Sequence, residues 1–168
     1  MDVADLLLEA HGRVPELCER AISGLTPDQL RQAPAPGANP IGWQIWHLAR
    51  VEDGHIAELL PAEQVWTEPG WAERFGLGPD PTNSGWGHTP DQVAAVRPES
   101  ADALIEYLHE VRSRTIPFLR ALSPADLDRV VDEGWDPPVT LGVRLVSIID
   151  DQVQHAGQAA YTRGLLGC

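Results

Sequence analysis

The sequence predicts an all-α protein, a four-helix bundle with a long irregular connector between its second and third long helices. Apolar residues recur at steps of three and four in four segments of roughly 20 residues each, the pattern of helices with one buried face. No run that alternates apolar and polar residues is long enough to indicate a β-sheet. Because 168 residues suffice for one sizeable core, we expect a single helical-bundle domain over residues 1–168.

The first two long helices are predicted over residues 2–23 and 40–60. The first should bend at Pro15, because proline has no amide hydrogen to donate within a helix. Gly24 should end it, and a short helical turn should follow from Thr26. The second should begin at Pro40, since proline is favoured in the first turn of a helix, and it is the most aromatic helix of the chain.

The predicted connector spans residues 61–99 and is rich in proline and glycine. It should contain two short helices, over residues 71–74 and 90–96. Irregular segments longer than about 12–15 residues are usually functional or disordered. This one holds three tryptophans, so we expect it to pack against the rest of the protein: Trp66, Trp71 and Trp86.

The last two long helices are predicted over residues 100–122 and 141–163. Ser100 and Thr140 are the expected N-caps, since their hydroxyls accept from the free amides of a first helical turn. Pro117 should kink the third helix, and Gly164 should end the fourth. The β-prone pairs between these helices, near residues 130 and 139, are too short to build a sheet.

The charge and composition exclude several classes of function. Twelve basic residues against 25 acidic ones give a net charge of -13, which repels nucleic acids and anionic membrane surfaces. The chain contains no lysine, so a lysine base or Schiff base is excluded. Phosphate-loop, dinucleotide-binding and serine-hydrolase motifs are missing. With an acidic start and two isolated cysteines, we expect a soluble protein of the cytoplasm.

A metal-ligating pattern lies in the fourth helix. Asp151 and His155 are four residues apart, which places both side chains on one face of a helix. Such pairs are common on exposed faces, where most bind nothing, but this helix is otherwise apolar. The second helix offers His47 in an apolar and aromatic setting. A bundle can bring these three residues together as metal ligands and leave coordination positions open, which is typical of catalytic rather than structural sites.

Four further polar residues have weaker claims to a role in this site. His55 lies two turns beyond His47 and either lines the pocket or packs as a half-buried histidine. Gln158 lies one turn beyond His155 and either supports a ligand or joins two helices. Glu52 either orients a ligand or faces solvent or a neighbouring helix. His88, in the connector, either reaches over the site or is exposed and without a role.

Two segments resemble the DinB-like metal-binding four-helix proteins, a family that includes thiol S-transferases using bacillithiol or mycothiol. The segment IGWQIWHLARVE, residues 41–52, is similar to the family's first ligand motif, in which Leu-Ala follows a histidine. The segment DQVQHAGQAAYTR, residues 151–163, is similar to the second, usually H-x3-H followed by Gly-Gln. The resemblance implies the bundle fold and a metal on His47, Asp151 and His155. Asp151 stands where many relatives have histidine.

This ligand set does not decide which metal binds, and it favours thiol chemistry. Two histidines and a carboxylate suit zinc, which we expect, and also iron(II), with nickel and manganese as further candidates. An anionic ligand makes the metal a weaker Lewis acid, and a thiol with a pKa of about 8.5 needs less acidification than water. We therefore expect a thiol S-transferase that joins a low-molecular-weight thiol to a small electrophile. Mycothiol is the expected thiol, because the all-arginine composition suggests a GC-rich genome.

Two other functions stay open at this point. A hydrolase would use a metal-bound hydroxide on the same three residues. A non-enzymatic bundle would use the metal only to stabilise its fold. A bundle of this size with aromatic helices is also compatible with a homodimer.

Overall fold

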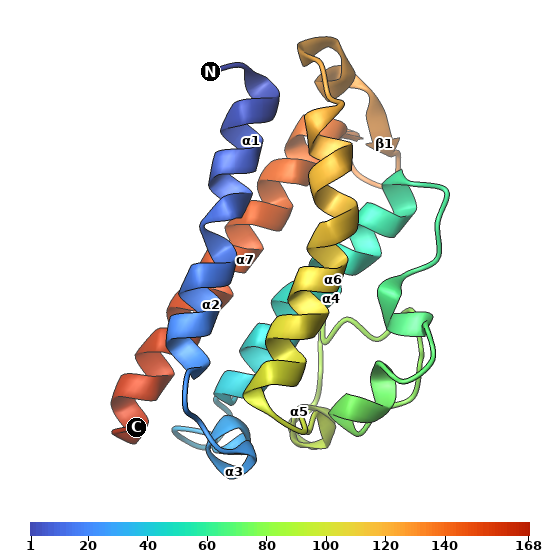
Figure 1. Ribbon diagram of the computed structural model, residues 1–168. Coiled ribbons are helices and arrows are strands. Elements are labelled where there is room, and N and C mark those ends of the chain that lie inside the picture. Colours follow the sequence, from blue (N-terminus) through green and yellow to red (C-terminus); the bar gives the residue numbers. More distant parts are fainter.

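Four long helical segments pack side by side and run the length of the molecule (Figure 1), which confirms the predicted all-α bundle. The computed structural model describes residues 1–168. None of its helices is both long and apolar enough to cross a membrane. The bundle consists of α1 (Val3–Gly12) with α2 (Val14–Ile22), α4 (Ile41–Leu59), α6 (Ala101–Arg120) and α7 (Leu141–Leu166).

The first predicted helix is two helices, α1 and α2, with a break at Arg13 rather than a bend at Pro15. Pro15 lies in the first turn of α2 and has no amide hydrogen for the carbonyl of His11. Arg112 of α6 donates to that carbonyl instead, at 2.7 Å. The helix therefore restarts where proline is tolerated, and a buried arginine satisfies the carbonyl that proline leaves without a partner.

The connector runs back along the bundle from the end of α4 to the start of α6, so that α4 and α6 are parallel (Figure 1). It contains η1 (Val65–Thr67), η2 (Ala72–Phe75) and α5 (Pro90–Ala95), and a further short helix, α3 (Pro27–Arg31), precedes α4. The rings of Trp66 and Phe75 are fully buried and each packs against Tyr107 of α6. The prediction that the connector packs against the protein is thus confirmed.

A small hairpin leads into α7, contrary to the expectation that its strands are too short to pair. After η3 (Pro124–Asp128), β1 (Val130–Asp132) pairs antiparallel with β2 (Val139–Thr140). Backbone hydrogen bonds between its two strands stabilise the hairpin. An ion pair between Arg144 of α7 and Asp132, at 2.8 Å, also ties it to the bundle.

The fourth predicted helix extends further than expected. Helix α7 continues past Gly164 to Leu166, and Gly167, in the left-handed conformation at φ 69°, caps it. Either glycine fits an end signal, and only Gly167 adopts the backbone conformation that ends a helix in this way.

A buried polar layer divides the apolar core into a larger and a smaller part. The larger part surrounds Trp46 and the smaller surrounds Ile56, at the end of the bundle where the hairpin lies. Between them, the carboxylate of Glu52 on α4 accepts hydrogen bonds from Thr115 of α6 and Gln152 of α7. Because buried polar groups need partners, this layer fixes the register of three helices.

Candidate metal centre

Helices α4 and α7 run antiparallel and bring His47, Asp151 and His155 together. One ligand atom from each residue lies within 4.8 Å of the others. Oδ1 of Asp151 is 3.7 Å from Nε2 of His47 and 3.5 Å from Nε2 of His155. Ligand bonds of 2.0–2.1 Å in a tetrahedral zinc site separate the ligand atoms by roughly 3.3 Å. The three residues predicted from the sequence therefore meet at a spacing suited to one cation.

His47 is held in the tautomer that leaves Nε2 free. Its Nδ1 donates to the backbone carbonyl of Ser84 in the connector, at 2.6 Å. A carbonyl oxygen only accepts, so the hydrogen lies on Nδ1 and the lone pair on Nε2 faces Asp151. The indole of Trp43 stacks on the imidazole with 4.6 Å between ring centroids. Only 3% of His47 is exposed, so the imidazole as a whole is buried.

His155 is oriented in the same way from the opposite side. Its Nδ1 donates to the side-chain oxygen of Gln44, one turn before His47 on α4. The edge of the Trp43 indole packs against its ring. Burial lowers the pKa of His155, although the charge of Asp151 and a hydrogen bond with Gln158 oppose this effect. The neutral, metal-ligating form of the imidazole is therefore favoured.

Asp151 supplies the negative charge of the centre. Its Oδ2 is buried and has no hydrogen-bond partner. A buried carboxylate oxygen without a donor is costly unless a cation compensates it. Two imidazoles whose Nδ1 atoms are held as donors and one such carboxylate are a donor set that fits a divalent ion.

A buried arginine holds the connector loop that orients His47. Arg50, one turn after His47 on α4, is fully buried and donates to the carbonyls of Pro81 and Asn83, both at 3.1 Å. Its charge is balanced by Asp53 at 3.1 Å. The carbonyl of Ser84 follows directly in this loop. Arg50 thus positions the backbone group to which His47 donates.

Gly85 allows this loop to approach the ligands closely. It has a φ of +95°, and a Cβ there would lie 2.8 Å from Nδ1 of His47 and 2.9 Å from the ring of Trp46. Only glycine satisfies both the backbone angle and the contact. The rings and the loop thus pack around the candidate centre without a gap on this side.

The four weaker candidates differ in how they relate to the centre. Gln158, one turn beyond His155 on α7, raises the pKa of His155 against the larger effect of burial. His88 accepts from the indole of Trp43 at 3.2 Å and so supports a ring that packs on both ligand histidines. Glu52 is fully buried and faces the neighbouring helices, as one of its two interpretations held. His55 is half-buried and contacts Arg144 and Glu58 rather than the three ligands.

The residues that orient the two histidines were not predicted from the sequence. Gln44 precedes His47 by three residues, a spacing that places it on the face of α4 that meets α7. This spacing could have identified Gln44 as a residue near the site, although nothing in the sequence indicates that Gln44 contacts His155. Ser84 acts through its backbone carbonyl, and a backbone contact leaves no signal in residue type. The neighbouring glycines at 85 and 87 indicate an unusual turn, and nothing more.

Comparisons with known proteins agree with this architecture. The family model of the DinB superfamily matches residues 10–159. A crystal structure of a conserved protein from Enterococcus faecalis is 38% identical and superposes with a TM-score of 0.90, covering 100% of this chain and 99% of that one. A search of curated proteins found no match. The chain belongs to the DinB superfamily.

Proposed function

We propose that this protein is a metal-dependent thiol S-transferase, which joins a low-molecular-weight thiol to a small electrophilic molecule. Membership of the DinB superfamily supports a metal-dependent reaction. The observation that carries the proposal is the convergence of His47, Asp151 and His155, with both histidine tautomers fixed and one buried carboxylate oxygen left without a partner. Three protein ligands leave coordination positions for a substrate, as catalytic rather than structural sites do.

Each residue of the centre has a definite task in this reaction. A divalent ion, which we propose to be zinc, supplies Lewis acidity that lowers the pKa of a thiol from its ordinary value of about 8.5. The carbonyl of Ser84 and the amide of Gln44 keep the Nε2 lone pairs directed at the ion. The charge of Asp151 moderates the acidity of the centre, which suits a thiol better than water.

The transfer itself is a substitution at carbon. The thiol proton passes to solvent, and a sulfur lone pair forms the new S–C bond. The bond between that carbon and its leaving group breaks, and the leaving group departs with the electron pair. We propose mycothiol as the thiol, because every one of the 12 basic residues is arginine, a bias typical of GC-rich genomes.

A thiol panel tests this function. The zinc-loaded protein is mixed with the aromatic electrophile chlorodinitrobenzene and, in turn, mycothiol, bacillithiol, glutathione or cysteine. We expect turnover that depends on thiol and metal, is fastest with mycothiol, and falls at least 100-fold in Asp151→Asn. Turnover of esters or amides without any thiol would instead identify a hydrolase. No turnover, with a loss of folding stability on chelation, would identify a bundle that the metal only stabilises.

A further inference from the structure

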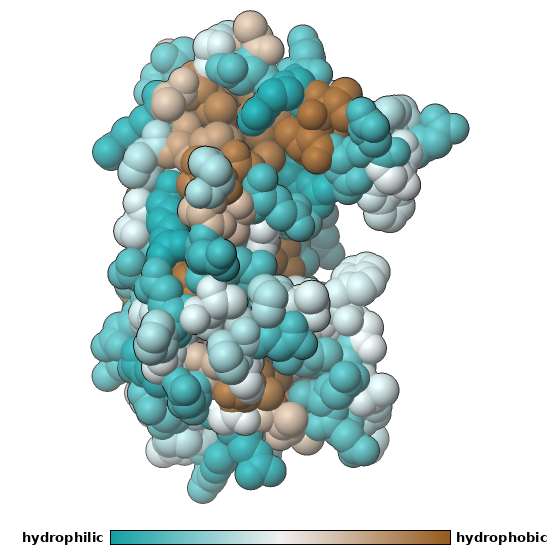
Figure 2. Space-filling model, turned by 90° about the vertical axis from the view of Figure 1, so that its right-hand side faces the viewer, coloured by the Kyte–Doolittle hydropathy of each residue, from teal (hydrophilic) through white to brown (hydrophobic).

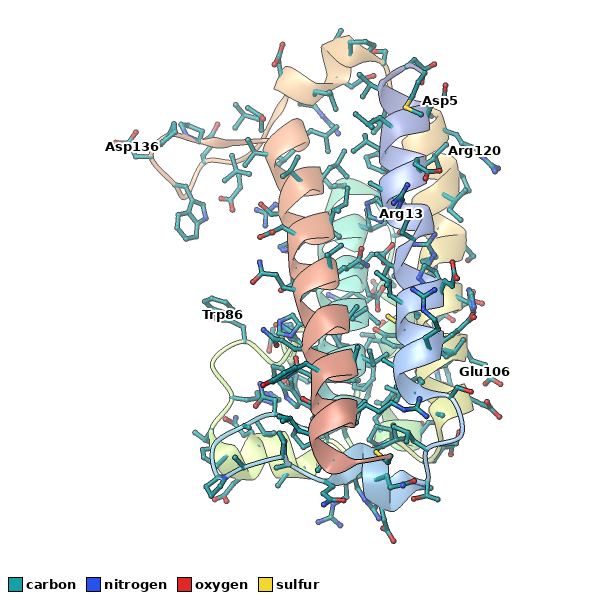
Figure 3. All side chains as sticks on the ribbon, turned by 90° about the vertical axis from the view of Figure 1, so that its left-hand side faces the viewer. Asp5, Arg13, Trp86, Glu106, Arg120 and Asp136 are labelled. Carbon is teal, nitrogen blue, oxygen red and sulfur yellow. The ribbon has the colours of Figure 1, made fainter.

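A hollow lies between two projecting segments on one side of the bundle. Figure 2 shows it as a notch at the right-hand edge of the molecule. In Figure 3, the upper projection is the hairpin that carries Asp136, and the lower one is the connector loop that carries Trp86. On this side, α4 and the connector enclose a cavity of about 400 Å³, whose lining includes Val51, His55, Glu58 and Ser84. Cavities of about 300–1,000 Å³ are the size that small ligands occupy.

This cavity borders the loop that orients a candidate metal ligand. Ser84, which lines the cavity, is the residue whose carbonyl accepts from His47. Val51 lies one helical turn after His47, and His55 one turn further, so the lining follows the same stripe of α4. A ligand in this cavity would therefore contact the loop that orients His47.

An exposed tryptophan lies on each of the two projections that border the hollow. Trp86, two residues after Ser84, is 89% exposed, whereas Trp66 of the same connector is fully buried. Trp135 of the hairpin is 67% exposed and follows Asp132 by three residues. Asp132 binds Arg144 at 2.8 Å, and Arg144 lies 3.1 Å from the ring of His55 in the cavity wall.

The two segments that carry these indoles are each anchored by contacts of their own. The loop of Trp86 is fixed by Arg50 and by the contact between Gly85 and His47. The hairpin of Trp135 is fixed by the chain from Asp132 through Arg144 to the cavity wall. Two indoles exposed on the two projections that border one hollow are candidate contacts for a bound ligand. Flat faces of indoles favour flat partners.

We propose that this cavity binds the electrophile of the S-transferase, and that the electrophile carries a neutral or cationic aromatic ring that stacks on Trp86 and Trp135. That the ligand is an electrophile rests on the proposed function. Glu58 lines the cavity, and the one arginine of the lining, Arg50, is paired with Asp53, so an anionic ring is disfavoured. The polar wall accepts hydrogen-bonding substituents of the ring.

Binding is tested without turnover, with dinitrotoluene as a neutral flat ring that has no leaving group. Equilibrium dialysis gives its Kd for the wild-type protein, Trp86→Ala, Trp135→Ala and Tyr161→Ala. An aromatic pair contributes roughly 0.5–1.5 kcal/mol, so each tryptophan variant should bind roughly 2- to 10-fold more weakly. Tyr161 is 71% exposed on α7, outside this cavity, and its variant should bind like the wild type.

Kinetics then assign the bound ring to the electrophile. With the best thiol, the tryptophan variants should raise the Michaelis constant for chlorodinitrobenzene by a similar factor. They should leave the Michaelis constant for iodoacetamide, which has no ring, within twofold. Unchanged Kd values in both tryptophan variants would refute the subsite, whatever the thiol assay shows. Weaker ring binding without any thiol transfer would keep the ring site and refute its role for an electrophile.

A second copy of the chain is the competing occupant of the two indoles. Sedimentation equilibrium of the wild type and Trp86→Ala separates the two explanations. The small-molecule subsite predicts the same mass for both proteins. A wild-type dimer that dissociates in Trp86→Ala would assign the indoles to a subunit interface and overturn the proposal.

Discussion

Gly85 lies directly against the imidazole of His47, so that a Cβ at this position would be 2.8 Å from Nδ1. The same nitrogen donates to the carbonyl of Ser84, the preceding residue. The connector therefore touches a candidate metal ligand with backbone atoms alone. The connector loop therefore helps to position a ligand of the candidate metal centre. A substitution in the loop should change the position of His47.

Gly85→Ala should destabilise the fold and weaken metal binding. The left-handed backbone costs an alanine about 1–2 kcal/mol, and the contact with His47 should add about 1–3 kcal/mol. Gly87→Ala is a matched control, since its φ is +70° but nothing lies within 4 Å of its Cβ. Urea unfolding gives both free energies. Equal losses in the two variants would show that Gly85 does not press on the ligand.

Gln44→Leu should lower the affinity for zinc. The amide oxygen of Gln44 accepts from Nδ1 of His155, and loss of such a partner typically costs 10- to 100-fold in metal affinity. Gln154→Leu is the control, because Gln154 is exposed on α7 and bonds only to Asp150. Competition with a chromophoric chelator gives both values. An unchanged zinc affinity in Gln44→Leu would contradict the assigned orientation of His155.

Arg50→Met should destabilise the protein by about 3–5 kcal/mol, because it leaves the buried charge of Asp53 without its cation. It should also weaken zinc binding, since the loop that presents Ser84 loses its anchor. Arg20→Met removes an exposed ion pair with Glu16 and should cost no more than about 1 kcal/mol. Chemical denaturation with and without zinc measures both effects. Similar losses in the two variants would exclude an anchoring role for Arg50.

His11 should make the protein less stable in acid. Burial, aided by Arg112, lowers the pKa of His11 from 6.5 to about 4, and both ring nitrogens lack partners. Between these two pKa values the unfolded chain binds more protons than the folded protein does. The contribution of His11 to the free energy of unfolding is therefore complete above pH 6.5 and is lost as the pH falls toward 4. The full loss is on the order of 3 kcal/mol.

The matched variants His11→Leu and His109→Leu test this assignment, because His109 is half exposed beside Glu19. Unfolding free energies from pH 7.5 to 4 should fall less steeply in His11→Leu than in the wild type. The His109→Leu curve should stay parallel to the wild-type curve. A His11→Leu curve that is also parallel to the wild type would remove His11 as the source of the acid sensitivity.

The sequence predicted the bundle from patterns within single helices, and it predicted the three converging residues from such patterns together with the resemblance to the DinB-like family. Steps of three and four located the long helices, and the spacing of Asp151 and His155 placed them on one face. His47 could be added because one apolar face of its helix had to meet another. The break at Arg13 was not predicted, since it depends on Arg112 replacing a donor from a distant helix.

The supports of the site depend on tertiary contacts that residue type does not encode. Ser84 contributes a carbonyl, which every residue has, and Gln44 acquires its role only when α7 lies against α4. The hairpin before α7 was not expected from strands of three and two residues, which are held partly by Arg144. Trp135 therefore drew no attention in the sequence, although it lies in a segment that borders the hollow.

The zinc content of a matched pair of variants decides whether the three converging residues bind a metal. Asp150 and Asp151 are neighbours on α7, but only Asp151 meets the two histidines. The proteins are stripped with a chelator, loaded with zinc, desalted and analysed for metal, with circular dichroism to confirm folding. We predict one ion per chain in the wild type and Asp150→Asn, and well below one in Asp151→Asn and His155→Ala. A wild type far below one ion per chain, or variants that keep a full ion, would contradict a metal centre at these residues.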